Sequence, residues 1–160
     1  MKWSHFWSGF LLVVLLTFAK SQITHFNVPL EFSYFLVFFI IRSSDTVRAL
    51  LMTFTLSLGL DFIVQVGQVK GLACMSQLLL VYIVMLLKKH VIPNFEDLFL
   101  LGLFALFYLA DFYLRLLIGV ALNSPVPGVS PTVLVFHALV HTALFGAMQV
   151  LYLRFFPEEK

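Results

Sequence analysis

The sequence predicts an all-α integral membrane protein, a bundle of six transmembrane helices formed by a single domain over residues 1–160. Three observations lead to this prediction. The chain is 61% hydrophobic and only 11% charged, whereas a soluble domain is about half apolar and about a quarter charged. Its apolar residues fall into six runs, each near the roughly 20 residues that a membrane-spanning helix needs. The runs are continuously apolar and do not alternate, which excludes the strands of a membrane β-barrel.

The expected helices follow one another with short connections. They cover residues 4–19, 23–41, 47–66, 71–87, 97–120 and 132–155. Pro29 and Glu31 lie near the start of the second run, so its outer end is expected to be short or to lie at the membrane interface. The first run could instead be a secretory signal, because Lys2 precedes it and a passable cleavage site follows at 17–19. We favour an uncleaved first helix, which is the commoner arrangement in a multi-pass chain.

The placement of basic residues predicts that both termini are cytoplasmic. With the amino terminus inside, seven of the ten lysines and arginines lie on the inner side, and only Lys20 and Lys70 lie outside. The inner seven are Lys2, Arg42, Arg48, Lys88, Lys89, Arg154 and Lys160. Such an excess marks the cytoplasmic side of a membrane protein. The outer loop at 123–131 has no charge and three prolines, which predicts a stiff connection that a partner can contact.

In this orientation, the polar residues of the predicted spans gather in the outer half of the bundle. A rise of 1.5 Å per residue places Asp61 about 21 Å along an outward-running helix, and Asp111 and Arg115 lie at a similar depth. The polar layer consists of Glu31, Asp61, Gln77, Asp111, Arg115, His137 and His141. It could be a ligand pocket or a closed structural core, and the sequence leaves both interpretations open.

Each of these polar features also has a structural interpretation. Asp111 and Arg115 are four residues apart, so they share a helix face and can pair; a structural pair and a role in a site are equally supported. His137 and His141 have a spacing that could bind a metal or haem, but no Glu follows the first His as in zinc proteases. Hydrogen bonding between helices is therefore favoured for the histidines.

Asp61 has no partner within a helical turn. A carboxylate at membrane depth costs about 2.5–3.5 kcal/mol, so we expect a polar contact from another helix, with Arg115 as the first candidate. The single cysteine, Cys74, excludes an internal disulfide and a cysteine-based metal cage. We expect no metal and no other cofactor. A net charge of +2 is too small to indicate nucleic-acid binding.

The third and fourth runs carry a family resemblance. Gly59 and Asp61 lie near the end of one run, Gly67 lies in the following turn, and Gly71 with Leu72 opens the next run. This pattern resembles the MreD family of rod shape-determining membrane proteins. The specific part covers residues 29–87, while the chain length and the number of spans also fit. The turn, VQVGQVKG, departs from the small-residue form more usual in that family.

The resemblance implies a non-enzymatic scaffold or regulator in the bacterial inner membrane. MreD-like proteins serve peptidoglycan synthesis and the regulation of cell shape. They pair with the bitopic protein MreC and act alongside MreB, RodA and a class B transpeptidase. The family is also similar in fold to the S-components of energy-coupling-factor transporters, so a substrate-binding subunit for vitamin uptake is the alternative. S-components dock through small residues on their first three spans. The first run here is bulky, with only Gly9 and Ala19 besides serines, which favours the scaffold.

Overall fold

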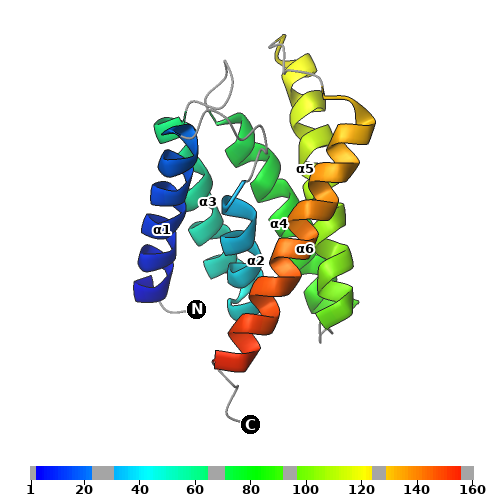
Figure 1. The fold of residues 1–160 in the computed structure, drawn as a ribbon. Helices are drawn as coiled ribbons and strands as arrows, with labels where there is room; N and C mark the ends of the chain where they lie inside the picture. The colour runs from blue at the N-terminus through cyan, green and yellow to red at the C-terminus, as the bar shows by residue number, and fades with distance from the viewer. Residues whose placement is uncertain (1–2, 23–30, 65–70, 92–96, 124–128, 156–160) are drawn as a thin grey trace.

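The computed structural model describes residues 3–22, 31–64, 71–91, 97–123 and 129–155. All secondary structure in these ranges is helical, which confirms the predicted class (Figure 1). The helices are α1 (Trp3–Gln22), α2 (Ser33–Ser43), α3 (Thr46–Val64), α4 (Leu72–His90), α5 (Asp97–Ala121) and α6 (Pro131–Phe155). The first turn of α1 and the last turn of α6 lie at the same end of the bundle. Which side of a membrane this end faces stays a prediction.

Four helices, α3 to α6, are long and apolar enough to cross a membrane. They have 19 to 25 residues, or about 28–38 Å at 1.5 Å per residue, against a hydrocarbon thickness of about 30 Å. The protein is therefore a multi-pass membrane protein. The apolar part of α1, Trp3–Ala19, is shorter, and α2 has only 11 residues. The number of crossings beyond four stays a prediction.

The second helix differs from the predicted span of residues 23–41. It begins at Ser33 and ends at Ser43, and residues 23–30 lie outside the described part of the chain. Eight of its 11 residues are buried. A helix that is mostly apolar and mostly buried belongs in the core of a bundle, and α2 occupies this place. The Lys88 ammonium group on α4 donates to the last carbonyls of α2, at 2.6 Å from Ile41 O and 3.1 Å from Arg42 O.

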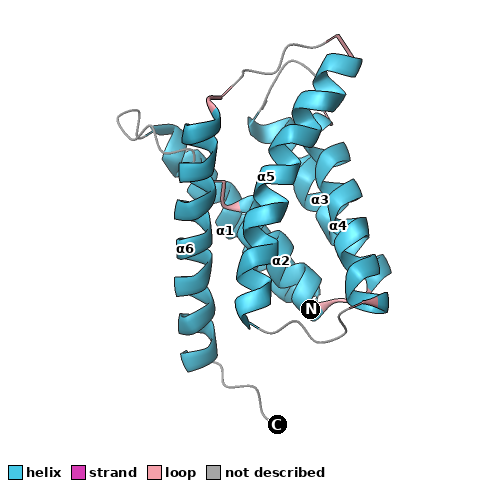
Figure 2. Cartoon of the chain, turned by 90° about the vertical axis from the view of Figure 1, so that its right-hand side faces the viewer, coloured by secondary structure: helices cyan, strands magenta, loops and turns pink. Residues whose placement is uncertain are grey.

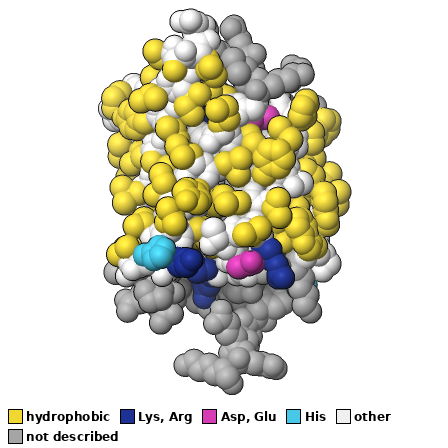
Figure 3. Space-filling view, turned by 180° about the vertical axis from the view of Figure 1, so that it is seen from behind, with side chains coloured by type: hydrophobic (Ala, Val, Ile, Leu, Met, Phe, Trp, Pro, Cys, Tyr) yellow, Lys and Arg dark blue, Asp and Glu magenta, His cyan; other side chains and the backbone are white. Residues whose placement is uncertain are grey.

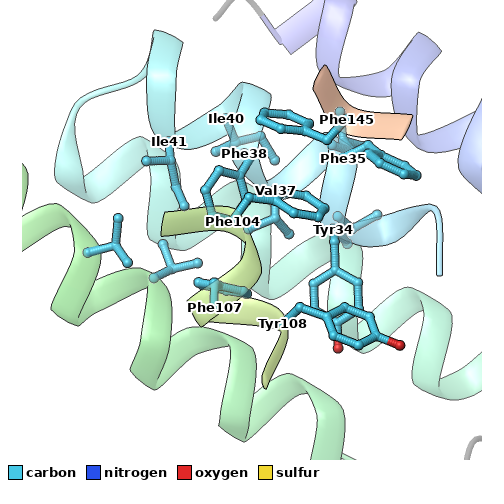
Figure 4. Packing of buried hydrophobic residues seen from close by; sticks show 14 of the residues in the cluster. Tyr34, Phe35, Val37, Phe38, Ile40, Ile41, Phe104, Phe107, Tyr108 and Phe145 are labelled. Carbon is cyan, nitrogen blue, oxygen red and sulfur yellow. The ribbon is translucent and has the colours of Figure 1, made fainter. Parts of the chain in front are cut away.

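Aromatic rings join α2 to α5 and α6. Phe38 lies 4.9 Å from Phe104 and 5.6 Å from Phe145, measured between ring centroids, and Phe104 stacks on Phe145 at 4.5 Å. Such pairs add about 0.5–1.5 kcal/mol each beyond the area that they bury. Figure 4 shows these rings packed together, with Tyr34 and Tyr108 next to one another at the edge of the group. The hydroxyl groups of these two tyrosines therefore mark the edge of the aromatic core.

The long helices pack in chain order, α3 on α4, α4 on α5 and α5 on α6. Figure 2 shows α5 between α6 and α4. The first helix packs on α2 and α3, where two glycines allow close approach. A methyl group added at Gly9 would lie 2.9 Å from Leu36, and one added at Gly59 would lie 2.9 Å from Phe10. Small residues at such contacts let membrane helices pack closely where no hydrophobic effect acts between them.

The surface separates into an apolar belt and a charged end. Seen from behind, hydrophobic side chains cover the length of the bundle, and charged side chains form a row at its lower end (Figure 3). Asp45 and Arg48, whose side chains are about two-thirds exposed, form an ion pair near this end, where α4 also closes with Lys88, Lys89 and His90. The row lies at the same end as the start of α1 and the end of α6. The charged residues, which are unevenly distributed along the sequence, are therefore also concentrated at one end of the molecule.

Candidate functional site

Arg115 lies at the centre of a buried polar cluster between α2, α5 and α6. Its Nη2 atom is 2.5 Å from the Asp111 carboxylate, one turn earlier on α5, and 3.5 Å from the Glu31 carboxylate just before α2. The Asp111 side chain is fully buried and that of Arg115 is 12% exposed, while that of Glu31 is 35% exposed. Asp111 and Arg115 therefore form the ion pair that their four-residue spacing permits. Glu31 extends this ion pair toward the surface.

Tyr34 completes the centre of this cluster and was not among the predicted residues. Its hydroxyl accepts a hydrogen bond from Arg115 Nη2 at 3.0 Å and donates one to Asp111 Oδ2. Its ring lies 5.1 Å from that of Tyr108. The sequence did carry a signal, because Tyr34 follows Glu31 by three residues and so falls on the same side of a helical turn.

His141 closes the cluster on α6. Its Nε2 atom accepts a hydrogen bond from the Glu31 backbone N–H at 3.0 Å, and its Nδ1 lies 2.7 Å from the His137 carbonyl oxygen. A backbone N–H can only donate, so Nε2 is the acceptor and Nδ1 carries the proton of a neutral ring. Both ring nitrogens are therefore engaged. The ring also stacks on Tyr108, with centroids 4.7 Å apart.

His137 does not join the cluster through its side chain. Its ring is partly exposed and lies beside Phe136. Among the described residues, no group of three or more His, Cys, Asp or Glu side chains could hold a metal ion. The hydrogen bond from Glu31 to His141 agrees with the role favoured for the histidines, although it uses backbone atoms as well as the imidazole ring.

Asp61 makes its cross-helix contact with the start of α4. Its Oδ2 atom accepts a hydrogen bond from the Cys74 backbone N–H at 3.1 Å, and the Gly71 N–H also faces it. The expected contact with Arg115 is wrong, because the ion pairs that the structure gives Arg115 among the described residues are those with Asp111 and Glu31. The physical reason is that the first N–H groups of a helix lack partners within the helix and attract negative charge.

Gln77 lies in this second group, which joins α3 to α4. The Ser57 hydroxyl donates to Gln77 Oε1, and both side chains are buried. Gly71 immediately precedes α4 with a φ of 90°, a backbone conformation that glycine adopts readily. Gly67 lies outside the described residues. The predicted layer therefore divides in two. Glu31, Asp111, Arg115 and His141 join Tyr34 and Tyr108 in the Arg115 cluster, while Asp61 and Gln77 join Ser57, Gly71 and Cys74 in the Asp61 contact.

No family model, curated protein or solved structure matches this chain. The resemblance to the MreD family therefore rests on the residues that carry it.

The Arg115 cluster retains unsatisfied polar atoms. Asp111 Oδ1 and Arg115 Nε are buried without a hydrogen-bond partner, and so is the Thr53 hydroxyl on α3. The Ser76 hydroxyl lies beside Asp111 but donates to the Ala73 carbonyl oxygen at 3.1 Å. Unsatisfied buried atoms are rare in folded proteins, and each one calls for a physical explanation. They are the chemically distinctive feature of this site.

Proposed function

We propose that this protein is a non-enzymatic scaffold of the cell-elongation machinery in the bacterial inner membrane, where it binds a bitopic, MreC-like partner. In this proposal the chain crosses the membrane six times with both termini in the cytoplasm. It acts alongside MreB, RodA and a class B transpeptidase in peptidoglycan synthesis. One observation carries the proposal: the family-motif residues Gly59, Asp61 and Gly71 lie at the α1–α3 and α3–α4 contacts.

Each motif residue has a separate part in that arrangement. Gly59 receives the Phe10 ring of α1, and Asp61 accepts the Cys74 N–H of α4. Gly71 supplies the left-handed backbone conformation that starts α4. Each residue of this short glycine and aspartate pattern has a structural role at a helix contact. The pattern therefore supports a shared fold better than the same residues would in an unstructured turn.

The surface of α1 supports a scaffold over a transporter subunit. Large side chains on this helix point outward, with Trp7, Leu15 and Phe18 between 52% and 62% exposed. Its Gly9 instead packs against Leu36 of α2. Ser4, Ser8 and Ala19 are also exposed, but a small-residue surface for docking an energising subunit would need small side chains over most of the outside of α1.

Co-purification from native membranes tests the proposal. The full chain, carrying a small affinity tag, is isolated in mild detergent, and the proteins that accompany it are identified. We expect a bitopic MreC-like protein. Recovery of an ATPase module in its place would contradict the scaffold proposal and support vitamin uptake.

A loop replacement then tests where the partner binds. We expect that replacing residues 126–129 with a flexible polar linker of equal length reduces recovery of the partner, because a stiff loop loses little entropy on docking. The matched control is the same replacement at residues 92–95, between α4 and α5, which the proposed topology assigns to the cytoplasmic side. Equal recovery from both variants would place the binding surface elsewhere.

A further inference from the structure

An apolar groove lies between α3 and α4 on the outside of the bundle. It has a volume of about 570 Å³ and is lined by Leu50, Leu51 and Phe54 from α3 and by four residues of α4 between Met75 and Tyr82. Figure 2 places α3 and α4 on the side of the bundle away from α6. Figure 3 looks at that side and shows hydrophobic side chains directly above the charged row. The groove therefore lies in the apolar belt, next to the charged end.

Basic side chains lie on the helix faces that border this groove. Arg48 precedes Leu51 by one turn of α3, and Lys89 follows Tyr82 by two turns of α4, so each shares a face with a lining residue. Both basic side chains are exposed. Residues 42–48 and 86–91 together contain four lysines and arginines and one acid, Asp45. The end of the groove is therefore positively charged.

The ion pair of Arg48 with Asp45 does not remove this positive charge. The two charged groups are 3.4 Å apart, and both side chains are about two-thirds exposed. A surface ion pair of this kind contributes little to stability. Arg48 can therefore exchange the Asp45 carboxylate for another anion.

We propose that the groove binds an anionic phospholipid, with one acyl chain between α3 and α4 and the phosphate group at Arg48 and Lys89. The lengths agree with this arrangement. At 1.5 Å per residue, Phe54 lies about 9 Å beyond Arg48, and Met75 lies about 21 Å from Lys89. One leaflet contributes about 15 Å to the hydrocarbon core. The groove therefore covers the depth that an acyl chain reaches from a phosphate at the charged end.

A membrane helix is a poorer occupant of this groove. Helix contacts in membranes favour glycine, alanine, serine and threonine, as the contacts at Gly9 and Gly59 do here. None of the seven described residues that line the groove is of this kind. A helix is also about 10–12 Å across, so a volume of about 570 Å³ holds only about one turn of it. A thin, flexible acyl chain fits better.

Fluorescence quenching by dibrominated lipids tests the proposal, because bromine quenches an indole ring on contact. Trp3→Phe and Trp7→Phe remove the two tryptophans of the chain, and Phe54→Trp places one in the groove. The full chain is reconstituted in phosphatidylcholine vesicles that contain graded amounts of dibrominated phosphatidylglycerol or dibrominated phosphatidylcholine. We expect phosphatidylglycerol to bind at least about fivefold more strongly, because one basic side chain near a membrane surface contributes an attraction of this size.

Leu106→Trp, in the same background, is the matched control. Leu106 is 65% exposed, lies about as far from the start of α5 as Phe54 does from the start of α3, and does not line the groove. The indole ring at this position should show no preference between the two lipids. An equal preference at both positions would reveal only a general attraction of anionic lipid to the charged end, and would overturn the proposed site.

Charge variants test the position of the phosphate group. Arg48→Gln together with Lys89→Gln should abolish the preference in the groove and leave quenching by dibrominated phosphatidylcholine unchanged, because the apolar lining remains. Asp45→Asn should increase the preference, since Arg48 loses its competing carboxylate. An unchanged preference in the double variant would overturn the proposal. Quenching by neither lipid would show that protein covers the groove, and would equally overturn it. The proposal does not depend on the proposed function, because lipid binding is measured on the purified chain.

Discussion

Several buried or half-buried polar residues of this protein find partners in backbone groups as well as in opposite charges. Asp61 accepts the Cys74 N–H, His141 accepts the Glu31 N–H, and Lys88 donates to the carbonyls that end α2. Helix ends carry backbone groups without partners inside the helix, and lipid offers them none. A charged side chain from a neighbouring helix can therefore satisfy a helix end and be stabilised by it at the same time.

The contact at Asp61 leads to a prediction about two substitutions. Asp61→Asn should cost about 0.6 kcal/mol or less, the average for a polar contact between membrane helices, because an amide oxygen can still accept the Cys74 N–H. Asp61→Leu should cost about 1–3 kcal/mol, since it leaves a buried donor without a partner. Equilibrium unfolding in mixed micelles measures both values. Equal losses in the two Asp61 variants would contradict the contact.

The helices of this bundle differ in what they contribute. The four long helices α3 to α6 form the membrane-crossing frame. The short helix α2 fills the interior, and its rings stack against those of α5 and α6. The first helix lies at the edge of the bundle and depends on glycines for its contacts. A larger side chain at either glycine would push α1 away from its neighbours and weaken its attachment to the bundle.

A pair of glycine substitutions tests the attachment of α1. Gly59→Leu should destabilise the protein by about 1–3 kcal/mol, the usual cost of overpacking, because a side chain there meets Phe10 at once. Gly102→Leu is the matched control, since no atom lies within 4 Å of a methyl group added at Gly102; it should be neutral or slightly stabilising, as Leu favours helix more than Gly. Thermal unfolding measures both, and equal effects would show that Gly59 makes no close contact.

The whole molecule is polar at one end and apolar along its sides. The exposed charges at the end of α2, the start of α3 and the end of α4 gather where α1 begins and α6 ends. The Arg115 cluster lies toward the opposite end, because α5 runs away from the termini and Arg115 is in its last two turns. The molecule therefore has one end marked by exposed charges and an opposite half marked by buried polar contacts.

Cysteine labelling in intact cells tests this orientation. In a chain with Cys74→Ala, Ser130→Cys should react with a membrane-impermeant maleimide added from outside. Arg48→Cys should react only after the cells are opened, because the excess of basic residues predicts a cytoplasmic position for its end of the bundle. Both positions are exposed in the structure. The reverse pattern of labelling would invert the topology and contradict cytoplasmic termini.

The sequence by itself determined the helical membrane class, the places of the four long helices and the pairing of Asp111 with Arg115. These properties depend on composition and on spacing along one helix, which are local. Only the tertiary structure decided that α2 is a short interior helix, that Tyr34 joins Arg115 to Asp111, and that Asp61 meets the N–H groups of α4. Those outcomes depend on which helix end or ring lies opposite a side chain. Backbone partners leave no mark in the sequence, because every residue except proline carries the same N–H group.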